Sequence, residues 1–194
     1  MKLALATLTA LALASCATSR ATHRSYSAGT TPDPRFERFL ALEGDWYAVD
    51  EDGEPTDQLM TSYEVTAGGS AVLERVFPGS PSEMVTLYHL DNGQLMLTHY
   101  CAAGNQPTMR ALPCESRPPG VEEEVFFHCA GGTNMRSEED GHMHDATFRF
   151  LGPERFEAIW VYHEGGKQPE EVHMDLVRLQ TLGYWEGATD ADAE

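Results

Sequence analysis

Three histidines lie at the ends of two neighbouring apolar segments and could bind a metal ion together. His142 and His144 are two residues apart, so in a strand both side chains point to the same face. If the loop between the two segments is centred near Arg136, His128 pairs opposite His144. Three neutral imidazoles from two adjacent strands suit zinc or another borderline metal and leave coordination positions open. The spacing therefore predicts a metal site formed by His128, His142 and His144.

An alternative interpretation of these histidines needs no metal. The loop that precedes them contains Glu138, Glu139 and Asp140. Runs of charge usually form solvated faces, and His142 and His144 at the wet end of a strand would simply hydrogen-bond the acidic residues of their own loop. The sequence leaves both interpretations open.

A histidine and a cysteine two residues apart form a second candidate site, in the segment "LTHYCAAGNQ". His99 and Cys101 share a strand face with Leu95 and Leu97, and a glycine turn follows. A nucleophilic cysteine would need an activating neighbour and an oxyanion hole, and no sequence signature for either accompanies Cys101. A core histidine beside a buried thiol is the simpler interpretation.

Short strands must position these residues. After a short helical segment, apolar residues recur at every second position in about ten runs, which are separated by turn sequences such as "DNGQ" and "LGPE". The segment Pro34 to Gly44 has helical spacing instead, with a proline that a first turn tolerates and a glycine that ends it. A sandwich and a barrel both fit this pattern. Tight turns between successive runs favour an all-β, antiparallel up-and-down barrel of about ten strands with one short N-terminal helix.

Alternating strand direction predicts which residues share an end of this barrel. Most of the longer polar loops fall at one end, the mouth, together with His99, His128, His142 and His144, whereas His89 falls at the opposite end. A small, partly apolar ligand bound at the mouth would contact six residues: Tyr88, His99, Cys101, Asn105, Gln106 and Met109.

Several motifs carry a resemblance to a known fold family. The tripeptide "GDW", ending at Trp46, resembles the G-x-W motif in the first strand of lipocalin-like (calycin) barrels, and Arg178 fits the arginine that packs across that tryptophan. The segments "GGSAVLERVFPG", "EMVTLYHLDNGQLMLTHYC", "GNQPTMRA", "GGTNM" and "DGHMH" resemble an uncharacterised bacterial lipocalin-like lipoprotein family. The resemblance covers about Gly44 to Arg178. It implies a calycin-like barrel with structural roles for Trp46 and Arg178, and it implies no activity.

The first residues have the pattern of an export signal. Lys2 precedes the apolar run Leu3 to Ala14, which is too short to span a bilayer. The tetrapeptide "LASC", ending at Cys16, resembles the lipobox of bacterial lipoproteins, which implies cleavage before Cys16 and lipidation of that cysteine. Under that resemblance, Ala17 favours the outer membrane. An ordinary signal cleaved near Ala17 is the alternative.

The chain is therefore expected to have four segments. They are a signal peptide (1–15), a flexible tether carrying the lipidated Cys16 (16–33), a barrel domain (34–183) and an acidic disordered tail (184–194).

The charge balance excludes one class of partner. The chain has 13 basic and 31 acidic residues, a formal net charge of −18. Such a surface repels phosphate backbones and anionic headgroups, which argues against nucleic-acid binding and limits membrane contact to the lipid anchor.

Three cysteines follow the predicted lipidation site. In an oxidising compartment, one disulfide and one free thiol would be the simplest arrangement of Cys101, Cys114 and Cys129, and the pairing is open.

Three functions fit these observations. The leading hypothesis is a non-enzymatic protein of the bacterial cell envelope, lipid-anchored in the outer membrane and facing the periplasm, whose barrel binds a small, partly apolar ligand at its open end. The second is a metal- or haem-dependent enzyme that uses the histidines at the mouth, with zinc or haem as cofactor. The third is a structural lipoprotein with a filled barrel.

The lipobox resemblance generates a first prediction. Cys16→Ser should move the protein from the membrane fraction to the soluble fraction, because each buried methylene of an acyl chain adds about 0.8 kcal/mol of membrane affinity. Cell fractionation followed by immunoblotting measures this, and Cys101→Ser is the matched control that should stay with the membrane. A Cys16→Ser protein that still fractionates with the membrane would contradict the lipoprotein hypothesis.

Overall fold

The structure, a computed structural model, describes residues 31–113 and 117–179. Within these residues the chain forms ten strands, one α-helix and one short 3-10 helix: α1 (Phe36–Leu40), β1 (Gly44–Val49), β2 (Pro55–Thr66), η1 (Ala67–Gly69), β3 (Ala71–Val76), β4 (Met84–Asp91), β5 (Gln94–Tyr100), β6 (Gln106–Leu112), β7 (Glu123–Thr133), β8 (His142–Phe150), β9 (Arg155–His163) and β10 (Glu170–Val177). No helix in this part of the chain is long and apolar enough to cross a membrane.

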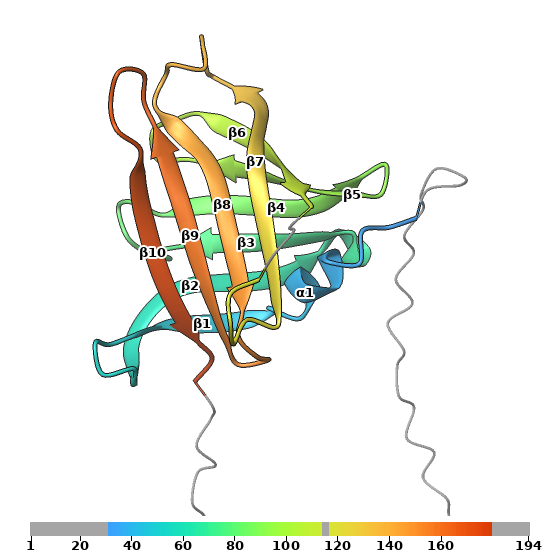
Figure 1. Ribbon diagram of the computed structural model, residues 1–194, viewed down its shortest axis with the longest axis vertical. Coiled ribbons are helices and arrows are strands. Elements are labelled where there is room, and N and C mark those ends of the chain that lie inside the picture. The colour runs from blue at the N-terminus through green and yellow to red at the C-terminus, as the bar shows by residue number, and fades with distance from the viewer. Residues whose placement is uncertain (1–30, 114–116, 180–194) are drawn as a thin grey trace, which may run out of the picture.

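The strands form one closed antiparallel barrel. Each strand pairs with its neighbours in the sequence, and β1 pairs with β10 to close the ring (Figure 1). The predicted up-and-down barrel of about ten strands with a short N-terminal helix is confirmed. The predicted signal peptide, Cys16, Cys114 and the acidic tail lie outside the described residues.

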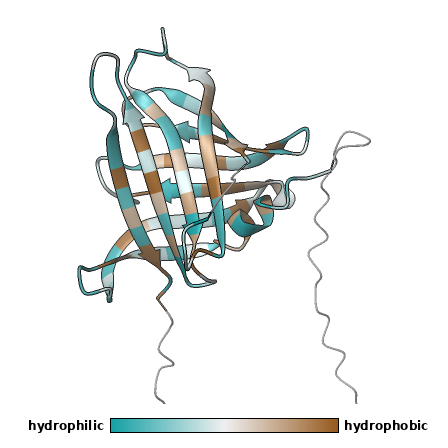
Figure 2. Cartoon of the chain, in the orientation of Figure 1, coloured by the Kyte–Doolittle hydropathy of each residue, from teal (hydrophilic) through white to brown (hydrophobic). Residues whose placement is uncertain are grey.

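Alternating side chains fill the barrel. On β5 the buried residues are Leu95, Leu97 and His99, and on β8 Phe148 and Phe150 follow the same period of two. Figure 2 shows hydrophobic and hydrophilic residues alternating along the strands. The inner face is therefore apolar, as expected for an antiparallel sheet with one face on a core.

Helix α1 closes the end of the barrel opposite the mouth. Its Phe39 is fully buried and stacks on Tyr88 with ring centroids 4.4 Å apart. The same ring meets Phe127, Phe148 and Phe150 edge-on at 5.7, 5.2 and 5.9 Å. These aromatic contacts fill the half of the barrel next to the helix, and such pairs add stabilisation beyond area burial.

One carboxyl group lies inside this core. Glu74 on β3 is fully buried, and its oxygens accept hydrogen bonds from the hydroxyls of Thr61 (2.9 Å), Tyr63 (2.7 Å) and Tyr88 (2.6 Å). Burial raises the pKa of Glu74, although the hydroxyl donors favour its ionised form. The polar group is thus satisfied within the barrel rather than open to a ligand.

Arg178 and Trp46 connect the segment after β10 to β1 at the closed end. The Arg178 guanidinium carbon lies 4.6 Å from the centroid of the Trp46 ring. The same guanidinium donates to the backbone oxygens of Glu43 (2.6 Å) and Ala41 (3.0 Å). Gly44 has a φ of +122°, and a Cβ at this position would lie 2.8 Å from Arg178 Nη1. Both facts require a glycine at the start of "GDW". The stacking expected from the family resemblance is present.

This contact generates a second prediction. Arg178→Ala should lower the free energy of unfolding by about 1–3 kcal/mol, because it removes a cation–π contact and two hydrogen bonds to backbone oxygens. Urea unfolding measures the change. Arg136→Ala is the matched control, since the Arg136 side chain is 92% exposed and ion-paired within its own loop. Equal stability losses in the two variants would show that Arg178 does not hold the closed end.

Candidate functional site

A half-open cavity of about 70 Å³ lies at the mouth of the barrel. Its lining comes from six strands and one loop: Val76, Phe77, Met84, His99, Met143, Trp160, Val172 and Met174. Val172 is 39% exposed and lies at the rim. The cavity is thus an apolar depression with one polar side chain, His99, in its wall.

The environment of His99 keeps its imidazole neutral. The side chain is 1% exposed, and its ring lies 4.9 Å from the ring of Trp160. Burial lowers the pKa of His99 to about 4. Nδ1 lies 3.0 Å from the hydroxyl of Thr86, whereas Nε2 has no hydrogen-bond partner. A buried polar atom without a partner costs about 1–3 kcal/mol, so a ligand group that met Nε2 would recover part of that cost.

Of the six residues predicted to contact a ligand, His99 alone lines the cavity. Tyr88 and Met109 are fully buried on the inner face, where Tyr88 packs against Phe39 and donates to Glu74. They are placed in the filled half of the barrel because α1 inserts Phe39 there. Sequence reasoning could assign both residues to the inner face, but it could not show that the helix occupies that space.

The other three predicted residues lie in and beside the loop between β5 and β6. Asn105 Nδ2 donates to the backbone oxygen of Gly141 at 2.7 Å, which ties this loop to the start of β8. Gln106 Nε2 donates to the backbone oxygen of Gly104 at 3.0 Å. Cys101 is a half-buried free thiol. Asn105 and Gln106 thus form hydrogen bonds with the backbone of loops at the mouth, and none of the three residues lines the cavity.

The three predicted metal residues lie together, although not in the predicted register. The last pair between β7 and β8 is His128 with Asp145, so the prediction that His128 pairs with His144 is wrong by one residue. The turn between the strands is centred between Arg136 and Ser137 rather than on Arg136, and this shifts every partner. The rings remain close, because the His144 ring centroid lies 4.8 Å from that of His128 and 5.3 Å from that of His142.

Hydrogen bonds orient these imidazoles. His128 Nδ1 lies 2.7 Å from a carboxylate oxygen of Asp145, and His142 Nδ1 donates to the backbone oxygen of Asp140 at 2.6 Å. His142 is fully buried, and its Nε2 has no partner. The His163 ring stacks on His144 at 4.1 Å, and burial, followed by the charge of His144, lowers the pKa of His163.

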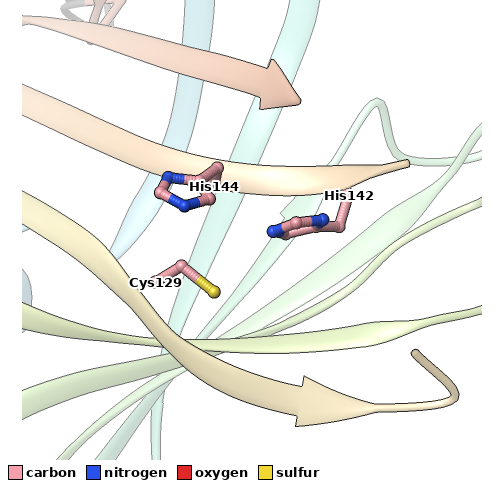
Figure 3. A group of neighbouring side chains, drawn as sticks. All are labelled: Cys129, His142 and His144. Carbon is pink, nitrogen blue, oxygen red and sulfur yellow. The ribbon is translucent and has the colours of Figure 1, made fainter. Parts of the chain in front are cut away.

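A cysteine that sequence reasoning did not include completes the cluster. Cys129 is a half-buried free thiol, and one ligand atom from each of Cys129, His142 and His144 lies within 4.8 Å of the others. Figure 3 shows its sulfur pointing toward the two imidazoles from the neighbouring strand. His128, His144 and Asp145 form a second group of the same dimensions. Cys129 directly follows His128, and the two side chains of a regular strand would point to opposite faces, so the local pattern does not assign the thiol to the cluster.

No family model, curated protein or solved structure matches the chain. The functional interpretation therefore depends on the geometry of the cavity and of the histidine cluster.

The neutral, buried His99 generates a third prediction. Its pKa is about 4 in the folded protein and about 6.5 in an unfolded chain, so the unfolded state binds more protons between these values. Stability from this residue is present above pH 6.5 and is lost as the pH falls toward 4. The loss is on the order of 3 kcal/mol.

The measurement compares urea unfolding of the wild type and of His99→Gln between pH 7 and pH 4. The wild type should lose more stability than the variant over this range, because glutamine does not titrate. Parallel stability curves would show that His99 is not held neutral by burial.

Proposed function

We propose that this protein binds the apolar part of a small molecule in the cavity at the mouth of its barrel. The half-open apolar cavity with the unpartnered Nε2 of His99 in its wall is the observation that supports this function. Concave, mostly apolar sites with a few polar groups are the usual form of small-molecule sites. His99 would fix the orientation of the ligand through one hydrogen bond.

The size of the cavity limits what enters it. At about 70 Å³ it is smaller than a cavity of about 150 Å³ that holds benzene, and much smaller than a typical ligand pocket of roughly 300–1,000 Å³. A short alkyl group or the edge of a ring therefore inserts, and the rest of the ligand stays at the mouth. The Phe39 cluster prevents deeper insertion because it fills the other half of the barrel.

Two alternative functions have less support at this cavity. An acid–base enzyme needs paired titratable groups, and His99 is the one titratable side chain among the described residues that line the cavity. A structural protein with a filled barrel agrees with the aromatic half next to α1. It does not account for an apolar cavity at the mouth with a buried, unpartnered nitrogen in its wall.

We also propose that the barrel is a lipocalin-like domain carried by a lipid anchor on Cys16 in the bacterial cell envelope. The "LASC" tetrapeptide behind a short apolar run supports the anchor, and the "GDW" motif with Arg178 over Trp46 supports the relationship. The strongly negative charge agrees with contact to the membrane through the anchor alone.

A fourth prediction tests the ligand site with straight-chain 1-alkanols from butanol to octanol. The probe is Trp160, whose fluorescence should change because its ring lines the cavity. Affinity should rise about fourfold for each added methylene, since each contributes about 0.8 kcal/mol, and should level off when the cavity is full.

Val172→Phe at the rim should weaken binding about tenfold or more by filling the opening. Val85→Phe is the matched control, because Val85 is on β4 but does not line the cavity. Equal binding by the two variants, or an unchanged fluorescence in the wild type, would refute the site. Mass spectrometry of protein purified from its native envelope would then identify the natural ligand.

A further inference from the structure

We propose that Cys129, His142 and His144 bind one zinc ion at the point where β7 and β8 separate. This site is distinct from the apolar cavity and does not depend on ligand binding there. It differs from the site that the sequence predicts, because a thiolate of β7 replaces the imidazole of His128.

Two β-bulges create this arrangement. On β8, Met143 pairs with Tyr162 and Asp145 pairs with Val161, which leaves His144 as an extra residue. On β7, Cys129 pairs with Met109 and Gly131 pairs with Thr108, which leaves one extra residue between Cys129 and Gly131. Bulges re-aim side chains and are common beside functional sites. Here both occur at the same end of neighbouring strands.

The separation of the strands provides the space. β7 and β8 form no pair beyond His128 and Asp145, and Figure 1 shows the two ribbons diverging toward the mouth. The side chains of Cys129, His142 and His144 occupy the gap (Figure 3). The ligand atoms lie within 4.8 Å of one another. Tetrahedral zinc with bonds of about 2.0–2.3 Å needs separations of roughly 3.5 Å, so the ligand atoms need to close by at most about 1 Å.

Each histidine has an oxygen close to Nδ1, which leaves Nε2 for the metal. His142 Nδ1 donates to the backbone oxygen of Asp140, which fixes the proton on Nδ1 and the lone pair on Nε2. His144 Nδ1 lies 3.2 Å from a carboxylate oxygen of Asp145, although the two do not form an aligned hydrogen bond. In a metal-binding histidine, the ring nitrogen that does not bind the metal usually donates to a carbonyl or carboxylate oxygen.

The buried and unpartnered Nε2 of His142 is the independent observation that points to a ligand. His142 is 0% exposed, and no atom of residues 31–113 or 117–179 forms a hydrogen bond with this nitrogen. A buried imidazole nitrogen without a partner is costly, whereas a metal ion would use its lone pair. The formal charge of −18 also favours a cation over an anion.

The thiol distinguishes this group from the second one. His128, His144 and Asp145 also lie close together, but His128 is nearly half exposed and is already bonded to Asp145 at 2.7 Å. Cys129 has only weak contacts of 3.5 and 3.6 Å with the backbone of Gly131. A thiolate with two imidazoles suits zinc, and three protein ligands leave a fourth position for water or another molecule.

Cobalt(II) is the probe for this site, because it occupies zinc sites and reports a bound thiolate by charge-transfer absorption in the near ultraviolet. The full-length protein is reduced, freed of reductant and titrated with cobalt(II), and zinc is then added in competition. We expect one cobalt per chain, a thiolate charge-transfer band, and displacement of the cobalt by zinc.

Three variants assign the ligands. Cys129→Ser should abolish the charge-transfer band and weaken zinc binding more than about 100-fold, since even the loss of an outer hydrogen-bond partner costs about 10–100-fold. His144→Ala should weaken binding similarly. Cys101→Ser is the matched control, a second half-buried free thiol outside the group, and should keep both the band and the affinity.

Other results would overturn the proposal. Zinc binding that survives Cys129→Ser and is lost in His128→Ala would assign the metal to the group of His128, His144 and Asp145. If the wild type binds no cobalt while its circular dichroism shows a folded β protein, the zinc site is refuted. The histidines are then hydrogen-bonded residues at the solvent-exposed ends of the strands. His142→Gln serves as a second ligand variant, because it preserves a polar side chain if alanine at the buried position prevents folding.

Discussion

The closure of the barrel depends on one short seam. β1 and β10 pair through two residue pairs, Tyr47 with Val177 and Ala48 with Leu176. A seam this short leaves part of both edge strands without a ladder, so side chains must supply the rest of the closure. Arg178 supplies such contacts. Its guanidinium covers the Trp46 ring and donates to the backbone oxygens of Ala41 and Glu43, which lie between α1 and β1. These hydrogen bonds, together with the packing of Phe39, hold α1 at the closed end.

The position of α1 in turn decides where a ligand can bind. The helix carries Phe39 into the barrel, where it packs on Tyr88, and Tyr88 and its neighbours satisfy the carboxyl group of Glu74. The aromatic cluster around Phe39 and the hydrogen bonds to Glu74 leave no room for a ligand at the closed end, because protein interiors are packed as densely as crystals of small organic molecules. The cavity at the mouth is the part of the interior that the helix does not reach.

The fold follows from local patterns, whereas the site depends on contacts between strands. Alternation around "DNGQ" predicts a two-residue hairpin, and the structure pairs Asp91 with Gln94 across Asn92 and Gly93, both with positive φ. The bulge at His144 leaves no such local signal, since an extra residue appears only when β8 is paired with β9. Glu74 shares an alternating face with Val72 and could have been assigned to the interior. Its hydroxyl partners come from two other strands, which no short motif reveals.

The bulge at His144 connects the two sites that the structure offers. Met143 directly precedes His144, and it points into the apolar cavity while His142 and His144 face the gap between β7 and β8. In a regular strand, successive residues lie on opposite faces, so a backbone shift at one residue also moves the next. A backbone shift that brought His144 closer to a bound metal ion would therefore also move Met143, its neighbour in the chain. The apolar cavity and the group of Cys129, His142 and His144 therefore share one segment of backbone.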